Sequence, residues 1–370
     1  METKLTEDAT RMAGDLTDCV SWSSEQLEKP FIVGLEAPLR GSQSATGRDM
    51  WRGALLAAEQ LNCEGGVRGR PVQLVKANDS ADPEMAATVV RKLRRKGADA
   101  VIGPYNSAVG IENIDNYLRK DIFPVHLTSS DQTSGKGATI QPKNSQISPV
   151  ESDYILKQKV KNVSMLVDPS TYTQGMAERL KESLTNNNIN VTTIEIKPGQ
   201  DSYRNKVRRA IKNNPDLVYL STYFPEGSTI LQDLEATGSQ ADRFLGLANV
   251  DQSLISNVGL KLAQTAVFSG VPEAAQLPTA KAYVEDYRTR FNKEPGVWGA
   301  FTYDSLKLLK DAANRAGTIR FNKLSKAVVN TMGYEGQTGQ ISIDPITGNR
   351  KKLPIFALKV NNFGEFIPMT

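Results

Sequence analysis

Short apolar runs alternate with amphipathic segments along most of the chain. Between residues 31 and 130, four apolar runs occur: FIVGLEAPL, PVQLVKAND, ADAVI and FPVHL. Three segments with apolar residues at helical spacing separate them, at residues 48–61, 84–96 and 109–120. Strands that alternate with helices in this way form a parallel sheet with helices on its faces. The pattern therefore predicts a doubly wound α/β fold.

The same alternation resumes after a polar, proline-containing stretch at residues 141–150. It predicts helices at 151–159, 176–186, 203–213 and 228–237, with strands at 162–167, 190–196, 216–220 and 243–247. Three more helices, at 279–291, 300–316 and 322–332, precede an end rich in strands. There, the tetrapeptide ITGN is typical of a hairpin turn. The chain is therefore expected to contain a second βα domain of the same kind.

Composition agrees with two soluble domains. The chain has 370 residues, of which 39% are hydrophobic and 23% are charged. Its net charge of +4 is too small to indicate binding to nucleic acid or to an anionic membrane. The polar N-terminus lacks the apolar core of a signal peptide. This segment is compatible with a removed signal, with a cytosolic protein and with a piece of a larger protein.

Residues with catalytic or metal-binding chemistry are few. The two cysteines, Cys19 and Cys63, are compatible with one disulfide or with two buried thiols. The single histidine, His126, lies inside a predicted strand, where a structural role is expected. No nucleophile elbow, phosphate-binding loop or zinc-ligand spacing is present. We therefore expect neither an enzyme nor a bound metal or cofactor.

Six loops at the carboxyl ends of the predicted strands share a polar composition. They are GSQSATG (41–47), GPYNSAVG (103–110), LTSSDQT (127–133), DPSTYTQG (168–175), STYFPEG (221–227) and LANVDQS (247–253). Such strand ends meet at one edge of an open α/β sheet, where ligands bind. Asn106 and Ser107 lie at a predicted helix start, which suits an anion such as a carboxylate. Tyr172 and Tyr223 offer flat apolar walls.

The run from Val33 to Pro83 resembles the first βαβ unit of a known family. The matching features are Pro38, Gly41, Gly53-Ala54, Asn62, Gly65-Gly66, Gly69-Arg70, Asp79 and Asp82-Pro83. The family is that of the branched-chain amino acid binding proteins of the periplasm, the leucine/isoleucine/valine receptors of ABC importers. The likeness extends over about Phe31–Val360, through VIGPYNSAVG, LVDPSTYTQG and FTYDSLKLL.

The resemblance implies a type I periplasmic binding fold: two doubly wound parallel-sheet lobes joined by a hinge of three crossovers. Residues 31–148 and 271–335 would form the first lobe, residues 149–270 and 336–370 the second, and residues 1–30 an extension. A ligand would be trapped in the cleft by closure of the lobes. The resemblance further implies a monomer outside the cytoplasm, with its signal peptide removed, that delivers its ligand to ABC permease subunits.

The resemblance also assigns roles in the site. Ser107 would hold the ligand carboxylate, and Thr128 and Ser130 would complete the clamp. Tyr172 and Tyr223 would close over the ligand, and Thr46 would line the pocket.

The loop LANVDQS, which contains Asn249, departs from the family pattern. Ala248 occupies the position of the acid that accepts the ligand ammonium in amino-acid receptors of this family. Asp251 or Glu226 could replace that acid. If neither reaches the ligand, an aromatic or other simple carboxylate becomes the better hypothesis than an α-amino acid. A sensor domain of the same fold, cytosolic or fused to a signalling protein, is the alternative function.

Overall fold

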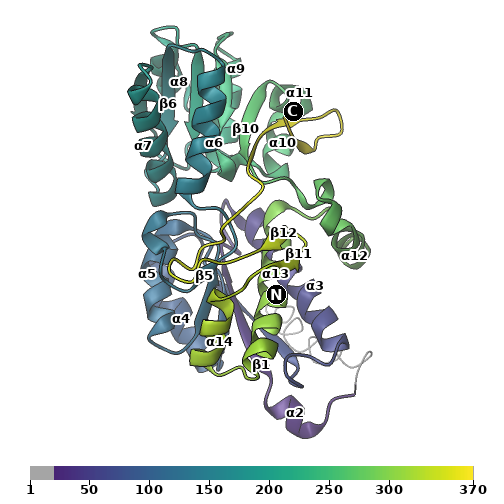
Figure 1. Cartoon of the computed structure of the whole chain (residues 1–370). Coiled ribbons are helices and arrows are strands. Elements are labelled where there is room, and N and C mark those ends of the chain that lie inside the picture. Colours follow the sequence, from purple (N-terminus) through teal and green to yellow (C-terminus); the bar gives the residue numbers. More distant parts are fainter. Residues whose placement is uncertain (1–20, 370) are drawn as a thin grey trace, which may run out of the picture.

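The structure is a computed structural model, and it describes residues 21–369. Cys19, one of the two cysteines considered for a disulfide, lies outside these residues. Figure 1 shows two α/β lobes, one above the other, connected by several crossing segments. We call the elements around the five-stranded sheet the first lobe and those around the seven-stranded sheet the second lobe. The short helix α2 (Ser24–Glu28) precedes the first lobe.

The sheet of the first lobe is entirely parallel, in the order β2-β1-β3-β4-β5. Its strands are β1 (Phe31–Ala37), β2 (Val72–Asn78), β3 (Ala100–Ile102), β4 (Phe123–His126) and β5 (Ala138–Thr139). The helices of this half are α3 (Ser44–Cys63), α4 (Ala86–Arg95) and α5 (Ser107–Leu118), with the 3-10 turns η2 (Pro83–Met85) and η3 (Asp131–Thr133). The apolar runs of the sequence thus form the strands, as the pattern predicts; β3 and β4 are fully buried, whereas the edge strand β2 alternates between buried and exposed positions.

The sheet of the second lobe has the order β14-β13-β10-β9-β8-β6-β7. Its parallel strands are β6 (Asn162–Val167), β7 (Asn190–Glu195), β8 (Leu217–Ser221), β9 (Asp242–Leu245) and β10 (Ala266–Gly270). The helices are α6 (Asn144–Lys157), α7 (Thr171–Asn186), α8 (Arg204–Ile211), α9 (Phe224–Glu235), α10 (Gln252–Val258) and α11 (Leu260–Ala263), with the turn η4 (Leu247–Asn249). The predicted doubly wound α/β fold is therefore confirmed.

After β10 the chain returns to the first lobe. It passes through η5 (Ala274–Gln276), η6 (Pro278–Ala280), α12 (Lys281–Phe291), α13 (Val297–Ala316) and α14 (Phe321–Val329). Helix α13 crosses α3 so closely that a Cβ on Gly53 would lie 1.9 Å from the carbonyl oxygen of Gly299. A side chain at this crossing would force the helices apart, which explains the glycine in the Gly-Ala pair of α3. Thr302 also donates a hydrogen bond to the carbonyl of Met50 at 2.7 Å.

The last part of the chain is divided between the two lobes. The strands β11 (Tyr334–Gly336) and β12 (Gly339–Ile341) pair only with each other, and the Asp304 carboxylate on α13 accepts the amides of Gln337 and Thr338. The buried Arg350 guanidinium donates to Thr338 and to the carbonyl of Ile140. Residues 334–350 therefore lie against the first lobe.

Antiparallel strands β13 (Phe356–Val360) and β14 (Phe366–Pro368) then complete the sheet of the second lobe. The final crossing thus lies between residues 350 and 356, later than the expected boundary near 335. The expected turn at ITGN does form, closed by a bridge between Ile343 and Arg350. It does not pair β12 with the following apolar strand, because that strand joins β10 instead.

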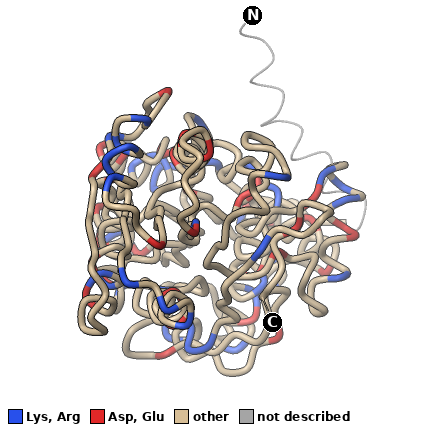
Figure 2. Tube along the Cα trace, turned by 90° about the horizontal axis from the view of Figure 1, so that it is seen from above, with Lys and Arg blue, Asp and Glu red and all other residues tan. Residues whose placement is uncertain are grey.

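Charged residues are spread over the whole molecule. Figure 2 shows Lys and Arg interspersed with Asp and Glu along the trace. Across residues 21–369, no helix is both long and apolar enough to cross a membrane. In the same part of the chain, no group of three or more His, Cys, Asp or Glu side chains is arranged to hold a metal ion.

Candidate ligand-binding site

A small cavity lies where the two lobes face each other. Its lining comes from loops after β3, β4, β6, β8 and β9, from the segment after β5, and from the start of α13: Tyr105, Ser107, Ser129, Gln141, Tyr172, Tyr223, Leu247, Ala248 and Trp298. The volume is about 10 Å³, which is room for one water. Any larger ligand must therefore push the lining residues apart or enter while the lobes are open.

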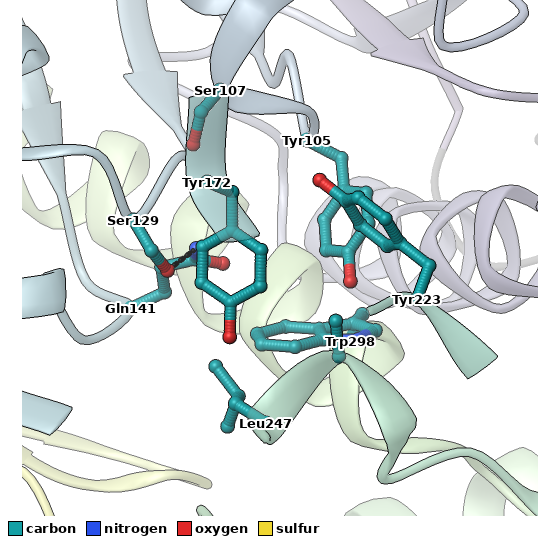
Figure 3. Close-up of a pocket in the computed structure, with 9 residues that line it drawn as sticks. Tyr105, Ser107, Ser129, Gln141, Tyr172, Tyr223, Leu247 and Trp298 are labelled. Carbon is teal, nitrogen blue, oxygen red and sulfur yellow. Dashed lines mark hydrogen bonds between the residues drawn. The ribbon is translucent and has the colours of Figure 1, made fainter. Parts of the chain in front are cut away.

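One side of the cavity is polar. Ser107 is the first residue of α5, and its buried hydroxyl oxygen accepts the amide of Ser130 at 3.1 Å. Ser129 accepts a hydrogen bond from the side-chain amide of Gln141 at 2.7 Å, the contact dashed in Figure 3. The helix start adds a partial positive charge to this side. The arrangement suits an anion with two acceptor oxygens, such as a carboxylate.

The facing side is aromatic. Trp298 lies against Tyr105, with 5.3 Å between ring centroids, and Tyr223 meets Tyr105 at 6.4 Å and Tyr172 at 5.8 Å. Figure 3 shows these rings grouped around the space beside Ser129 and Gln141. Burial raises the pKa of Tyr105, Tyr172 and Tyr223, so their hydroxyls stay protonated at neutral pH. The rings offer a flat, uncharged surface to a ligand.

Acidic side chains are absent from the nine lining residues. Asp251 caps α10 by accepting the amide of Ser253 at 2.7 Å, and its other oxygen accepts the hydroxyl of Thr46 at 3.1 Å. Glu226 accepts the amide of Gly199 at 3.1 Å. Both acids considered as replacements for the one missing at Ala248 therefore bond to other groups and do not line the cavity, whereas Ala248 itself does.

The clamp residues Thr128 and Ser130 do not line the cavity. The Thr128 hydroxyl lies 2.8 Å from Nδ1 of His126 and 2.7 Å from the Thr133 hydroxyl. The Ser130 hydroxyl caps η3 by accepting the amide of Gln132. Burial, helped by the nearby Lys143, lowers the pKa of His126 well below its usual range. The neutral imidazole thus has the structural role expected from the sequence.

Three more predicted residues hold the loops around the site. Asn106 donates to the side chain of Gln43 at 2.9 Å, and Asn249 donates to the carbonyl of Thr222 at 2.8 Å. Thr46 reaches across from α3 to Asp251, which joins the two lobes. Of the nine residues predicted for the site, the structure brings Ser107, Tyr172 and Tyr223 to the cavity and places the other six around it.

Five lining residues were not predicted: Tyr105, Ser129, Gln141, Leu247 and Trp298. Tyr105, Ser129 and Leu247 lie in loops that the sequence singled out, so alternating inward and outward positions could have found them. Trp298 belongs to a helix far along the chain whose packing the local pattern does not reveal.

Two α/β lobes with a cavity between them are the architecture of a protein that binds a small ligand. Comparison with known proteins gives the family. Residues 30–364 match the model of the periplasmic binding protein family. An amino acid binding protein of Pseudomonas aeruginosa is 27% identical over 77% of this chain and 79% of that protein. The Leu/Ile/Val-binding protein of Escherichia coli K12 is 26% identical, over 81% and 84%.

Solved structures agree in fold. A leucine binding protein of Thermotoga maritima superposes with a TM-score of 0.85 at 23% identity, covering 92% of this chain and 97% of that one. A solute binding protein of an ABC transporter from R. palustris, in complex with benzoate, has a TM-score of 0.83 at 17% identity, covering 91% and 95%. The chain belongs to the periplasmic binding protein family. It has the type I fold, and its relatives are solute-binding proteins, not enzymes.

Proposed function

We propose that this protein is the solute-binding protein of an ABC importer and traps a small carboxylate between its lobes. The family, the names of the relatives and the cavity at the strand ends support this role. Ligand capture would proceed by closure: open lobes admit the solute, contacts from both walls favour the closed form, and the transporter recognises that form. Delivery to permease subunits, a monomeric state and a location outside the cytoplasm belong to the same proposal.

The observation that carries the choice of ligand is the charge of the walls. The Ser107 and Ser129 side suits a carboxylate, whereas the opposite side is built of uncharged rings and contains no acid. An ammonium group desolvated there would lack a partner, which costs several kcal/mol, or on the order of a thousandfold in affinity. We therefore infer that the ligand has a carboxylate and a flat apolar body, and that it lacks the α-ammonium of an amino acid. An aromatic acid has these properties.

A panel of acids and matched neutral compounds tests the proposal. The panel contains benzoate, phenylacetate, benzamide, phenylalanine and leucine, each measured by thermal shift and by calorimetry. An acid at a hundred times its Kd should stabilise the protein by about 2.7 kcal/mol. We expect phenylalanine to bind at least a hundredfold more weakly than an aromatic acid of its size. Tight binding of leucine or phenylalanine without binding of the simple acids would refute the ligand class.

A further inference from the structure

A buried lysine lies directly behind the polar side of the cavity. Lys143 is in the crossing segment just before α6 and is fully buried. Its ammonium donates to the carbonyls of Thr128 and Ser130, each at 3.1 Å, and to the hydroxyl of Thr133 at 2.6 Å. The three protons of the ammonium are thus all used on the loop that follows β4. This is the loop from which Ser129 reaches the cavity.

The charge of Lys143 has no direct counter-ion. Among the ion pairs formed within residues 21–369, none includes Lys143. Asp131 is the acid whose charge raises the pKa of Lys143, but its carboxylate is paired with Arg179 of α7 at 2.9 Å. From β4 it faces the neutral His126. Burying an ammonium in this way is unfavourable, and burial lowers the pKa of Lys143 to about 7. An anion bound in the adjacent cavity would offset this cost.

The peptide units of the loop link the lysine to the cavity. In a trans peptide unit the C=O and the N–H point in opposite directions. Because the Thr128 carbonyl points at Lys143, the amide of Ser129 in the same unit points away from it. Within the described part of the chain, no group accepts a hydrogen bond from that amide. Ser129 lines the cavity, so its amide is placed to meet an acceptor there.

We propose that Lys143 is a positioning residue for carboxylate binding: it holds the Thr128 and Ser130 carbonyls so that the Ser129 amide faces the ligand, and it supplies the positive charge that the bound carboxylate balances. This inference rests on the proposed function, since it assumes a carboxylate at the Ser107 and Ser129 wall. It adds a source of anion selectivity that lies outside the lining residues.

The test compares benzoate with neutral benzamide between pH 6 and pH 8.5, by calorimetry, on the wild type and on Lys143→Met. Benzoate stays ionised over this range, whereas unliganded Lys143 loses its proton as the pH rises past about 7. We expect the Kd for benzoate to rise about tenfold over the range, because the bound anion favours the charged lysine. Benzamide should show no such trend.

In Lys143→Met, we expect benzoate to bind about tenfold more weakly at pH 6, with a flat pH profile, and benzamide to change much less. Lys136→Met is the matched control: it removes one cation from the same loop, but Lys136 is partly exposed and pairs with Asp115 at 2.6 Å. The control should keep the wild-type pH profile. Unfolding by urea without ligand verifies that each variant is folded.

Several outcomes would overturn the inference. A pH profile for benzoate that Lys143→Met shares with the wild type, or a flat profile in the wild type, refutes it while leaving the proposed function intact. Equal weakening of benzoate and benzamide in Lys143→Met would show a structural role only. A wild type that binds none of the acids refutes the proposed function, and the inference with it.

Discussion

At the scale of single residues, Ser107 has two roles, of which the sequence indicated only ligand binding. It lines the cavity, as a clamp residue should, and its oxygen also accepts the buried amide of Ser130. Replacing it removes a contact to the ligand and leaves an amide without an acceptor. Binding and stability are therefore linked at this position.

Ser107→Ala should weaken binding of an aromatic acid by tenfold or more and lower the free energy of unfolding without ligand by about 1–3 kcal/mol, the cost of an unpaired buried amide. Calorimetry and urea unfolding measure the two effects. Ser253→Ala provides a control, because the Ser253 side chain is outside the cavity and contributes only its backbone amide to the Asp251 cap. Unchanged affinity in Ser107→Ala would refute its role in the clamp.

Glu151 gives a second prediction at this scale. It is fully buried, it accepts the hydroxyls of Tyr219 and Ser269, and burial raises its pKa from 4.5 to about 7. The folded state holds the proton more tightly than the unfolded state, so this stabilising effect is complete below pH 4.5 and is lost as the pH rises through 7.

As the pH is raised from 5 to 7.5, we expect the urea concentration at the unfolding midpoint of the unliganded wild type to decrease. Glu151→Gln, whose side chain stays neutral, should show a smaller decrease. Glu273 has its pKa raised to about 7 in the same way and should account for part of the remaining slope. An identical slope in Glu151→Gln and the wild type would contradict the assignment to Glu151.

At the scale of elements, helix α6 shows where sequence patterns stop being informative. Pro149 made the segment before residue 151 read as a break, yet α6 begins at Asn144 and contains the proline. Proline inside a helix loses one backbone hydrogen bond. Here one tertiary and one local contact fix the helix start: the Asn144 amide donates to the Ser129 carbonyl, and the side-chain oxygen of Gln146 accepts the amide of Lys143.

The contact between Thr46 of α3 and the cap of α10 gives the prediction at this scale. It joins the lobes at 3.1 Å and is lost when they part. Thr46→Val should therefore weaken ligand binding about three- to tenfold, the net value of one hydrogen bond, with little change in unliganded stability. Thr289→Val is a suitable control, since the Thr289 hydroxyl bonds only within α12. A loss of stability equal to the loss of binding would contradict a role in closure.

At the scale of the whole molecule, local patterns predict most of the fold and less of the site. Alternating strands and helices are visible because most strands are buried, among them β1, β3 and β8, and the helices bury apolar residues at helical spacing. Local patterns do not reveal the path of the chain between the lobes, because contacts between residues far apart in sequence fix it. Asp304 accepts the amide of Thr338, and Arg350 donates to the carbonyl of Ile140. Trp298 was not predicted for the same reason. It lies on α13, which packs in the first lobe only after the chain has passed through the second lobe.

The fluorescence of Trp298 can report ligand binding between the lobes. The chain has three tryptophans, and of these only Trp298 lines the cavity. An aromatic acid that enters should change the fluorescence of this ring. Trp298→Phe should abolish most of the change while retaining an aromatic wall, whereas Trp51→Phe should keep it. A full signal in Trp298→Phe would place the ligand elsewhere.

The late crossing between residues 350 and 356 affects how the chain folds during synthesis and how its lobes can be exchanged. The sheet of the second lobe gains its last two strands from residues 356–368, after residues 297–350 have covered the first lobe. A growing chain on the ribosome therefore completes the first sheet once residue 139 has been added, but carries the second sheet unfinished until residues 356–368 follow. Neither lobe corresponds to one continuous stretch of the gene, so exchanging a lobe between relatives requires three junctions, not one.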